Sequence, residues 1–216
     1  MENKGLEEVY TFHHREHGRL GRSMFSEVRG NFLRKYIGTG KEILDIGCRD
    51  GVLTATYCEG NHVLGLDIDV GALEVAKGKL GIDTQYTDLN GDWNVPENHF
   101  DVVVAGEVME HLYYPENVTK KIAHALKSDG IFLGSVPNAF SLRSRVQLFF
   151  GKKQGTPLGD PTHINHFSRK ELVGVLEKYF ADVEIVPLGR FVWLDRIFPG
   201  LFCFMFLFRA QGKKAL

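Results

Sequence analysis

Three aspartates stand at the ends of successive apolar runs in the first half of the chain. Asp45 lies within LDIGCRDG (44–51), Asp67 ends the run HVLGLD, and Asp88 follows IDTQYT. The carboxyl ends of parallel strands meet at one edge of a sheet, where such sheets bind their ligands. The three acids therefore predict a shared ligand site. Carboxylates attract a cation and repel a phosphate, and this contrast separates the ligand classes that a glycine-containing turn can hold.

The turn after Asp45 does not suit a dinucleotide. Dinucleotides bind to G-x-G-x-x-G, where backbone N–H groups and a helix end hold the pyrophosphate. Here Gly47 is followed by Cys48 and Arg49 before Gly51, so the spacing fails. Asp45 would also add a negative charge beside two phosphates. A nicotinamide-dependent dehydrogenase is therefore not expected.

S-adenosylmethionine fits the same acids, because it carries an ammonium and a sulfonium. The carboxylate of Asp45 attracts the cationic end of this cofactor. Asp67 lies twenty residues after Gly47 and is placed to accept hydrogen bonds from the ribose hydroxyls. Asp88 is placed to accept one from the adenine amino group. The three positions together predict a site for this cofactor.

A second group of chemically capable residues follows the apolar run FDVVVAG. In GEVMEHL, Glu107, Glu110 and His111 are spaced i, i+3 and i+4, so one helical turn would place them on one side. Two carboxylates and an imidazole suit a divalent cation, and PTHINHFS offers a fourth ligand as His163 or His166. Alternatively, Glu110 and His111 hydrogen-bond neighbouring loops. In that case His111 or His163 is the candidate general base.

Strands and helices must alternate to position these residues. Apolar runs predict five strands, at 42–47, 62–69, 82–88, 100–106 and 131–136. Helices are predicted after Gly51, from Ala72 to Leu80, and from Pro115 to Gly130. This alternation predicts an α/β, Rossmann-like fold.

The C-terminal part completes the predicted sheet. Ser168 and Glu171 form a capping box that begins an amphipathic helix. DVEIVPL and LFCFMFLFRA then supply two further strands. We therefore expect a seven-stranded, mostly parallel sheet with helices on both faces and an antiparallel last strand. The run from 191 to 208 is either a buried final strand with the loop before it, or a patch that docks on a membrane.

Composition divides the chain into a short leading part and one main domain. Residues 1–38 begin with a polar lead-in that is rich in histidine and arginine, and a helix follows from Ser23. Within the lead-in, Tyr10 is a candidate contact to the adenosine. Residues 39–216 form the main domain, in which 139–167 is a long connection, predicted to be a lid or acceptor-binding insertion. Within it, Arg143, Arg145 and Lys152 surround VQLFF, which suits an acidic, partly apolar acceptor. The alternative is an amphipathic helix whose basic face is solvated.

Bulk properties narrow the partners and the location. The net charge of −1 provides no basic field for DNA, and no RNA-binding module is recognisable, so RNA is not favoured. Three cysteines without a C-x-x-C pair indicate reduced thiols, and the polar N-terminus is unlike a secretory signal. We therefore expect a cytoplasmic protein.

The ordered motifs also resemble a known family. EILDIGCRDG, VLGLDID, TDLN and FDVVVAGEVMEHL resemble the motifs of class I S-adenosylmethionine-dependent methyltransferases, over residues 40–137. HINHFSRKELVGVLEKYF resembles a segment of the branch that includes ubiquinone-type O-methyltransferases. The resemblance implies a cofactor site formed by Asp45, Gly47, Cys48, Arg49, Gly51, Asp67, Ile68, Asp88, Leu89 and Gly106.

One position departs from the family pattern. The family usually shows acid-x-Gly-x-Gly-x-Gly, and here the middle glycine is Arg49. A side chain is tolerated there if φ is negative and the side chain points away. Arg49 either pairs with the carboxylate of the cofactor or is solvated.

The resemblance implies in-line methyl transfer to an oxygen of a small-molecule, glycan or lipid-linked acceptor. The E-x-x-E-H pattern with a later histidine also resembles the magnesium site of small-RNA 3′-end 2′-O-methyltransferases, and that of metal-dependent ubiquinone-type enzymes. An RNA-end 2′-O-methyltransferase with bound Mg²⁺ is therefore one alternative. A non-catalytic S-adenosylmethionine-binding subunit is another, because Arg49 interrupts the glycine series.

Overall fold

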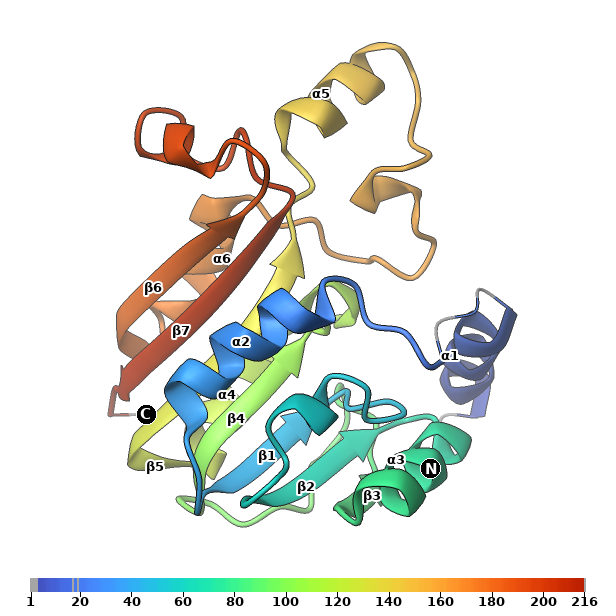
Figure 1. Cartoon of the computed structure of the whole chain (residues 1–216), viewed down its shortest axis with the longest axis vertical. Helices are drawn as coiled ribbons and strands as arrows, with labels where there is room; N and C mark the ends of the chain where they lie inside the picture. Colours follow the sequence, from blue (N-terminus) through green and yellow to red (C-terminus); the bar gives the residue numbers. More distant parts are fainter. Residues whose placement is uncertain (1–3, 17, 19, 216) are drawn as a thin grey trace.

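A seven-stranded sheet with strand order β3-β2-β1-β4-β5-β7-β6 runs through the computed structural model, which describes residues 4–16, 18 and 20–215 (Figure 1). The strands are β1 (Glu42–Ile46), β2 (His62–Asp67), β3 (Asp83–Tyr86), β4 (Phe100–Gly106), β5 (Leu126–Pro137), β6 (Phe180–Leu188) and β7 (Met205–Lys213). Strands β1 to β5 pair in parallel, and β7 pairs antiparallel with both β5 and β6. The order reverses between β1 and β4, which is where such sheets bind ligands.

Helices cover both faces of this sheet, as predicted. The helices are α1 (Lys4–Glu16), α2 (Ser26–Ile37), α3 (Val70–Leu80), α4 (Pro115–Ala125), α5 (Leu142–Phe149) and α6 (Arg169–Leu176). Short 3₁₀ helices add η1 (Thr54–Thr56), η2 (Met109–His111), η3 (Pro157–Gly159) and η4 (Val192–Arg196). Among the described residues, no helix is long and apolar enough to cross a membrane.

Two apolar layers hold the helices to the sheet. On one face, Leu33 of α2 and Ala76 of α3 pack with Ile43 of β1. On the other face, Ile122 of α4 and Leu172 of α6 pack with the opposite side of the sheet. Successive residues of a strand point to opposite faces, so runs that are apolar throughout, such as β4, serve both layers. The predicted seven-stranded α/β fold is confirmed.

The helix predicted after Gly51 is absent from this described segment, and the short η1 takes its place. Two threonine hydroxyls compete with helical hydrogen bonding there. The Thr54 hydroxyl donates to Asp45 at 2.5 Å, and the Thr56 hydroxyl donates to the Leu53 carbonyl at 2.7 Å. The prediction was wrong because these threonines stabilise a tight turn.

A second predicted boundary was also wrong. The helix that begins at Pro115 ends at Ala125 rather than at Gly130. Leu126 adopts an extended conformation and pairs with Phe100 of β4, and its side chain is fully buried. Burial of Leu126 in the core therefore begins β5 five residues earlier than the glycine signal indicated.

The N-terminal lead-in, for which no helix was predicted before Ser23, contains the helix α1. The Tyr10 hydroxyl donates to the carbonyl of His111 at 3.2 Å, and His14 lies 2.9 Å from the carboxylate of Asp69. These polar contacts hold a helix that has little apolar surface, so its composition concealed it. The connection 139–167 likewise contains α5 and η3.

Candidate cofactor and acceptor site

A cavity of about 1030 Å³ opens where β1, β2 and β4 end. It lies at the upper limit of the roughly 300–1,000 Å³ that small-molecule sites usually have. Residues of α1 and α2 border it together with the turns after the three strands, and α5 and the segment before β7 border its other end. Its size suits two molecules side by side.

All three strand-end acids border this cavity, so the predicted convergence of Asp45, Asp67 and Asp88 is present. Asp45 accepts hydrogen bonds from the hydroxyls of Thr54, at 2.5 Å, and Tyr57, at 2.7 Å. Burial raises the pKa of Asp45 to about 6, although both hydrogen bonds act in the opposite direction. A cation beside this carboxylate would offset the cost of its desolvation.

Asp67 is held by the backbone of the turns around it. Its two oxygens accept hydrogen bonds from the N–H groups of Arg49, at 2.8 Å, and Asp69, at 3.0 Å. Burial raises the pKa of Asp67. Asp88 is half-buried and accepts a hydrogen bond from the N–H of Asn90 at 2.9 Å. Both carboxylates therefore have fixed orientations at the cavity wall.

The two glycines of the first turn have different roles. Gly47 borders the cavity with φ +68°, and a Cβ there would lie 2.5 Å from Val108. Gly51 does not line the cavity, although it was predicted to bind the cofactor. With φ +77°, it packs against α3, where a Cβ would lie 2.6 Å from Leu80. Gly51 therefore shapes the turn on the side that packs against α3, away from the cavity.

The condition under which a side chain at position 49 was expected to be tolerated, a negative φ, is not met, because the φ of Arg49 is +51°. Its guanidinium donates to Asp50 at 3.0 Å and to the carbonyl of Arg22. The guanidinium is therefore engaged with the segment that joins α1 to α2. A left-handed non-glycine residue costs about 1–3 kcal/mol, and such residues cluster at functional sites. Glu107, at φ +61°, is a second one on the same wall.

A residue that the sequence prediction missed, Arg29 of α2, contributes a positive charge to this wall. Its side chain is 2% exposed, and it donates to Glu107 at 2.9 Å. Two of its guanidinium nitrogens, Nε and Nη2, are buried without a hydrogen-bond partner among the described residues. A Cβ on the neighbouring Gly106 would lie 2.6 Å from Nη2, so this glycine leaves room for the guanidinium. Arg29 shares a helical stripe with Leu33 and Ile37, which is a signal that could have identified it.

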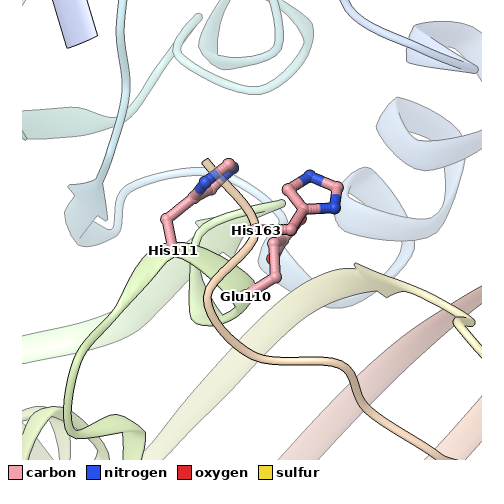
Figure 2. A group of neighbouring side chains, drawn as sticks. All are labelled: Glu110, His111 and His163. Atoms are coloured by element: carbon pink, nitrogen blue, oxygen red, sulfur yellow. The ribbon is translucent and has the colours of Figure 1, made fainter. Parts of the chain in front are cut away.

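Glu110, His111 and His163 meet at the far side of the cavity. One potential ligand atom from each lies within 4.8 Å of the others, although the two histidines are far apart in sequence. Figure 2 shows Glu110 and His111 on the turn after β4, and His163 on the segment that crosses over it. Two further residues that the sequence offered as metal ligands are not part of this group. Glu107 pairs with Arg29, and His166 lies outside the group.

Hydrogen bonds to backbone carbonyls fix the orientation of the two imidazoles. Nδ1 of His111 lies 2.9 Å from the Thr162 carbonyl, and Nδ1 of His163 lies 2.9 Å from the Pro157 carbonyl. A carbonyl only accepts, so Nδ1 carries a proton in both rings. Nε2 of His163 faces the carboxylate of Asp160 at 3.8 Å. Burial, followed by the charge of His163, lowers the pKa of His111 to about 4.

Glu110 completes this group as an unusual carboxylate. It is 1% exposed, and both of its oxygens are buried without a hydrogen-bond partner in the described part of the chain. Burial, followed by the charge of Glu107, raises the pKa of Glu110 well above its ordinary value. A buried carboxylate beside two imidazoles fits a divalent cation, because the cation would supply a positive charge next to the carboxylate.

Most of the predicted cofactor residues border the cavity. They are Asp45, Gly47, Cys48, Arg49, Asp67, Ile68, Asp88, Leu89 and Gly106. Of the predicted acceptor residues, only Arg143 borders it. Arg145 donates to the Phe140 carbonyl at 2.8 Å, and Lys152 is exposed after α5. Tyr10 and His14 of α1 line the cofactor side.

The chain matches a family model described as a methyltransferase domain, over residues 13–183. A ubiquinone biosynthesis O-methyltransferase from Aeromonas salmonicida is 28% identical over 167 residues, which are 70% of this chain and 69% of that protein. A S-adenosylmethionine-dependent methyltransferase from Archaeoglobus fulgidus superposes with a TM-score of 0.70 at 20% identity, covering 95% of this chain and 100% of that one. A possible histamine N-methyltransferase from Thermotoga maritima gives 0.65 at 15% identity, covering 88% and 90%.

The chain belongs to the methyltransferase-domain family. It is a S-adenosylmethionine-dependent methyltransferase with a Rossmann-like fold, resembling the ubiquinone-type enzymes. The names of its fold neighbours refer to different acceptors, so the fold does not assign the methylated atom.

Proposed function

We propose that this enzyme methylates a hydroxyl oxygen of a small-molecule, glycan or lipid-linked acceptor, with the cofactor against β1 and β2 and the acceptor beside Glu110, His111 and His163. The observation that carries the proposal is the group of two oriented imidazoles and a buried carboxylate at the cofactor cavity. The relatives named as O-methyltransferases support oxygen as the target.

The charged groups of the cofactor have matching partners on this wall. The ammonium and sulfonium face Asp45, and the ribose hydroxyls donate to Asp67. The methionine carboxylate pairs with the positive charge of Arg29, which borders the cavity, rather than with Arg49. Arg29 is the more deeply buried of the two, and the Arg49 guanidinium is already bonded to Asp50. These assignments extend the predicted site by one residue.

The group of three side chains fits Mg²⁺ or another divalent cation. Glu110, His111 and His163 would hold it, and a bound cation would supply the positive charge that lowers the pKa of an acceptor hydroxyl. His111 alone is a poor general base, because its pKa of about 4 leaves it little affinity for a proton at neutral pH. Its neutral form is the one that binds metals.

The chain itself contributes alignment and exclusion of water. Methyl transfer is an in-line displacement that releases a neutral thioether, so no covalent nucleophile is needed. Helix α1 covers the cavity through Tyr10, and burial raises the pKa of Tyr10 well above its ordinary value. Tyr10 therefore stays neutral and serves as a packing and hydrogen-bonding group.

The test incubates the enzyme and tritiated S-adenosylmethionine with four acceptor pools: a small-metabolite extract, a lipid extract, a glycan fraction and total RNA. We expect label in the metabolite, lipid or glycan pool that survives mild base, as an ether does, and a loss of labelling with EDTA that Mg²⁺ restores. Label only in RNA would favour the RNA-end alternative. No label in any pool, with intact binding of the demethylated product, would favour a non-catalytic subunit.

A further inference from the structure

Two segments with exposed apolar side chains flank the acceptor end of the cavity. One is α5 with its flanking residues, 140–153, and the other is the loop 189–204, which contains η4. Both border the same cavity, and the N–H of Leu142 donates to the carbonyl of Leu201 at 2.7 Å. In Figure 1, α5 and the red loop before β7 project beyond the same end of the sheet. We call these two segments the docking surface.

The largest apolar side chains of the docking surface point into solvent. Phe149 is 85% exposed and Phe150 is 68% exposed on the first segment. Trp193 is 70% exposed and Ile197 is 69% exposed on the second. Single exposed apolar residues are common, but aromatic residues gathered around a cavity mouth mark an interaction surface.

The exposed charges of the docking surface are all positive. They are Arg143, Arg145, Lys152, Lys153, Arg190 and Arg196. The acid within these segments, Asp195, is buried and pairs with Arg169 at 2.8 Å. These two segments therefore carry six exposed positive charges, although the whole chain has a net charge of −1.

The backbone of the loop is fixed by buried polar contacts. Asp195 accepts a hydrogen bond from the N–H of Gly200 at 2.7 Å. The side-chain amide of Asn138 donates to the carbonyls of Gly200, at 2.6 Å, and Cys203, at 2.8 Å. The loop therefore has a fixed backbone, from which Trp193 and Ile197 point outward.

We propose that the docking surface binds an anionic lipid bilayer and places the mouth of the cavity against it. Aromatic and aliphatic side chains insert at the headgroup boundary, while lysine and arginine attract anionic lipids. A second copy of the chain is a poor occupant, because six positive charges would face six others. This inference rests on the proposed function in one respect: a lipid-linked acceptor would enter the cavity from the bilayer.

The test is co-sedimentation of the full chain with vesicles of phosphatidylcholine alone or with 30 mol% phosphatidylglycerol. We expect binding to the anionic vesicles that decreases with salt. The pair Lys152→Gln and Lys153→Gln should weaken binding about 30-fold, since each basic side chain near an anionic surface contributes about fivefold. The matched pair Lys77→Gln and Lys79→Gln on α3 should leave binding unchanged.

Trp193→Ser tests the apolar contribution, with Val75→Ser on α3 as its control. We expect at least a tenfold loss for Trp193→Ser, and binding of the demethylated cofactor product should be unchanged in every variant. Intact product binding without vesicle binding by the wild-type chain would overturn the inference and leave the proposed function standing. Equal vesicle binding by all variants would also overturn it, as would a dimer that Trp193→Ser converts to a monomer.

Discussion

The two ends of the cavity are built in opposite ways. The cofactor end consists of buried carboxylates and strained turns at the ends of β1, β2 and β4, where hydrogen bonds fix the carboxylates of Asp45 and Asp67. The acceptor end consists of α5 and the η4 loop, whose aromatic and basic side chains are largely exposed. In the proposed function, the cofactor end holds one small charged molecule, whereas the acceptor end admits a larger partner from outside.

The largest effect is expected on the affinity for S-adenosylmethionine, and it should differ between two arginines of the cofactor end. Arg29→Met should raise the Kd for S-adenosylmethionine about 100-fold, because it removes a buried charge that the cofactor carboxylate needs. Arg49→Ala should change it less than fivefold, since that guanidinium already contacts Asp50. Isothermal titration calorimetry measures both values. A greater loss for Arg49→Ala would reverse our assignment.

Glu110→Gln tests the proposed cation group, which lies where the two ends of the cavity meet. We expect Mn²⁺ affinity to fall about 10- to 100-fold, the usual cost of damaging a metal site, with cofactor affinity unchanged. Electron paramagnetic resonance of bound Mn²⁺ gives the first value and calorimetry the second. Glu177→Gln, an exposed carboxylate at the end of α6, is the control. Equal Mn²⁺ binding by Glu110→Gln and the wild type would remove the cation from the proposal.

Gly47→Ala should destabilise the cofactor end by about 2 kcal/mol, through its positive φ and a contact with Val108. Gly174→Ala, in α6, has open space around its Cβ. It should be neutral or stabilise the fold by up to about 1 kcal/mol. Denaturant unfolding measures both free energies. Equal effects would show that the turn is not strained.

The pH dependence of cofactor binding should follow Asp45. Its pKa is about 6 in the folded protein and 3.8 ordinarily, so the folded state binds the extra proton between these values. The free energy of unfolding should therefore fall as pH rises from about 4 to 6. The cofactor ammonium favours the ionised form, so affinity for the demethylated product should rise about tenfold from pH 5 to pH 7 and then level off. Asp45→Asn should abolish both trends, and a slope that persists in this variant would assign them to another group.

The smallest effect is expected at the acceptor end. Phe149→Ser should change the free energy of unfolding by less than about 0.5 kcal/mol, because the ring is 85% exposed and little packing is lost. Differential scanning calorimetry checks this. A strong destabilisation would mean that the acceptor end is packed as tightly as the cofactor end.

Local patterns were enough to predict most of the fold. The bounds of β4 and the capping box of Ser168 and Glu171 were predicted from sequence, because periodicity and caps depend on neighbouring residues. The convergence of Asp45, Asp67 and Asp88 followed from the same strands, since parallel strand ends share an edge.

Contacts between distant residues were not predicted. Arg29 and Glu107 are 78 positions apart, and their pairing diverts Glu107 from the cation group. The choice of His163 over His166 depends on how the connection crosses the turn after β4. Helix α1 depends on contacts with Asp69 and His111, which no local signal of its own specifies.

The position of β7 has a consequence for how the chain is assembled. β7 lies between β5 and β6, and β6 forms its sheet hydrogen bonds with β7 alone among the described strands. During synthesis, β6 leaves the ribosome before its only sheet partner exists. The edges of β5 and β6 that β7 will join stay unpaired until residues 205–213 emerge. The nascent chain therefore depends on rapid insertion of this one strand or on a chaperone.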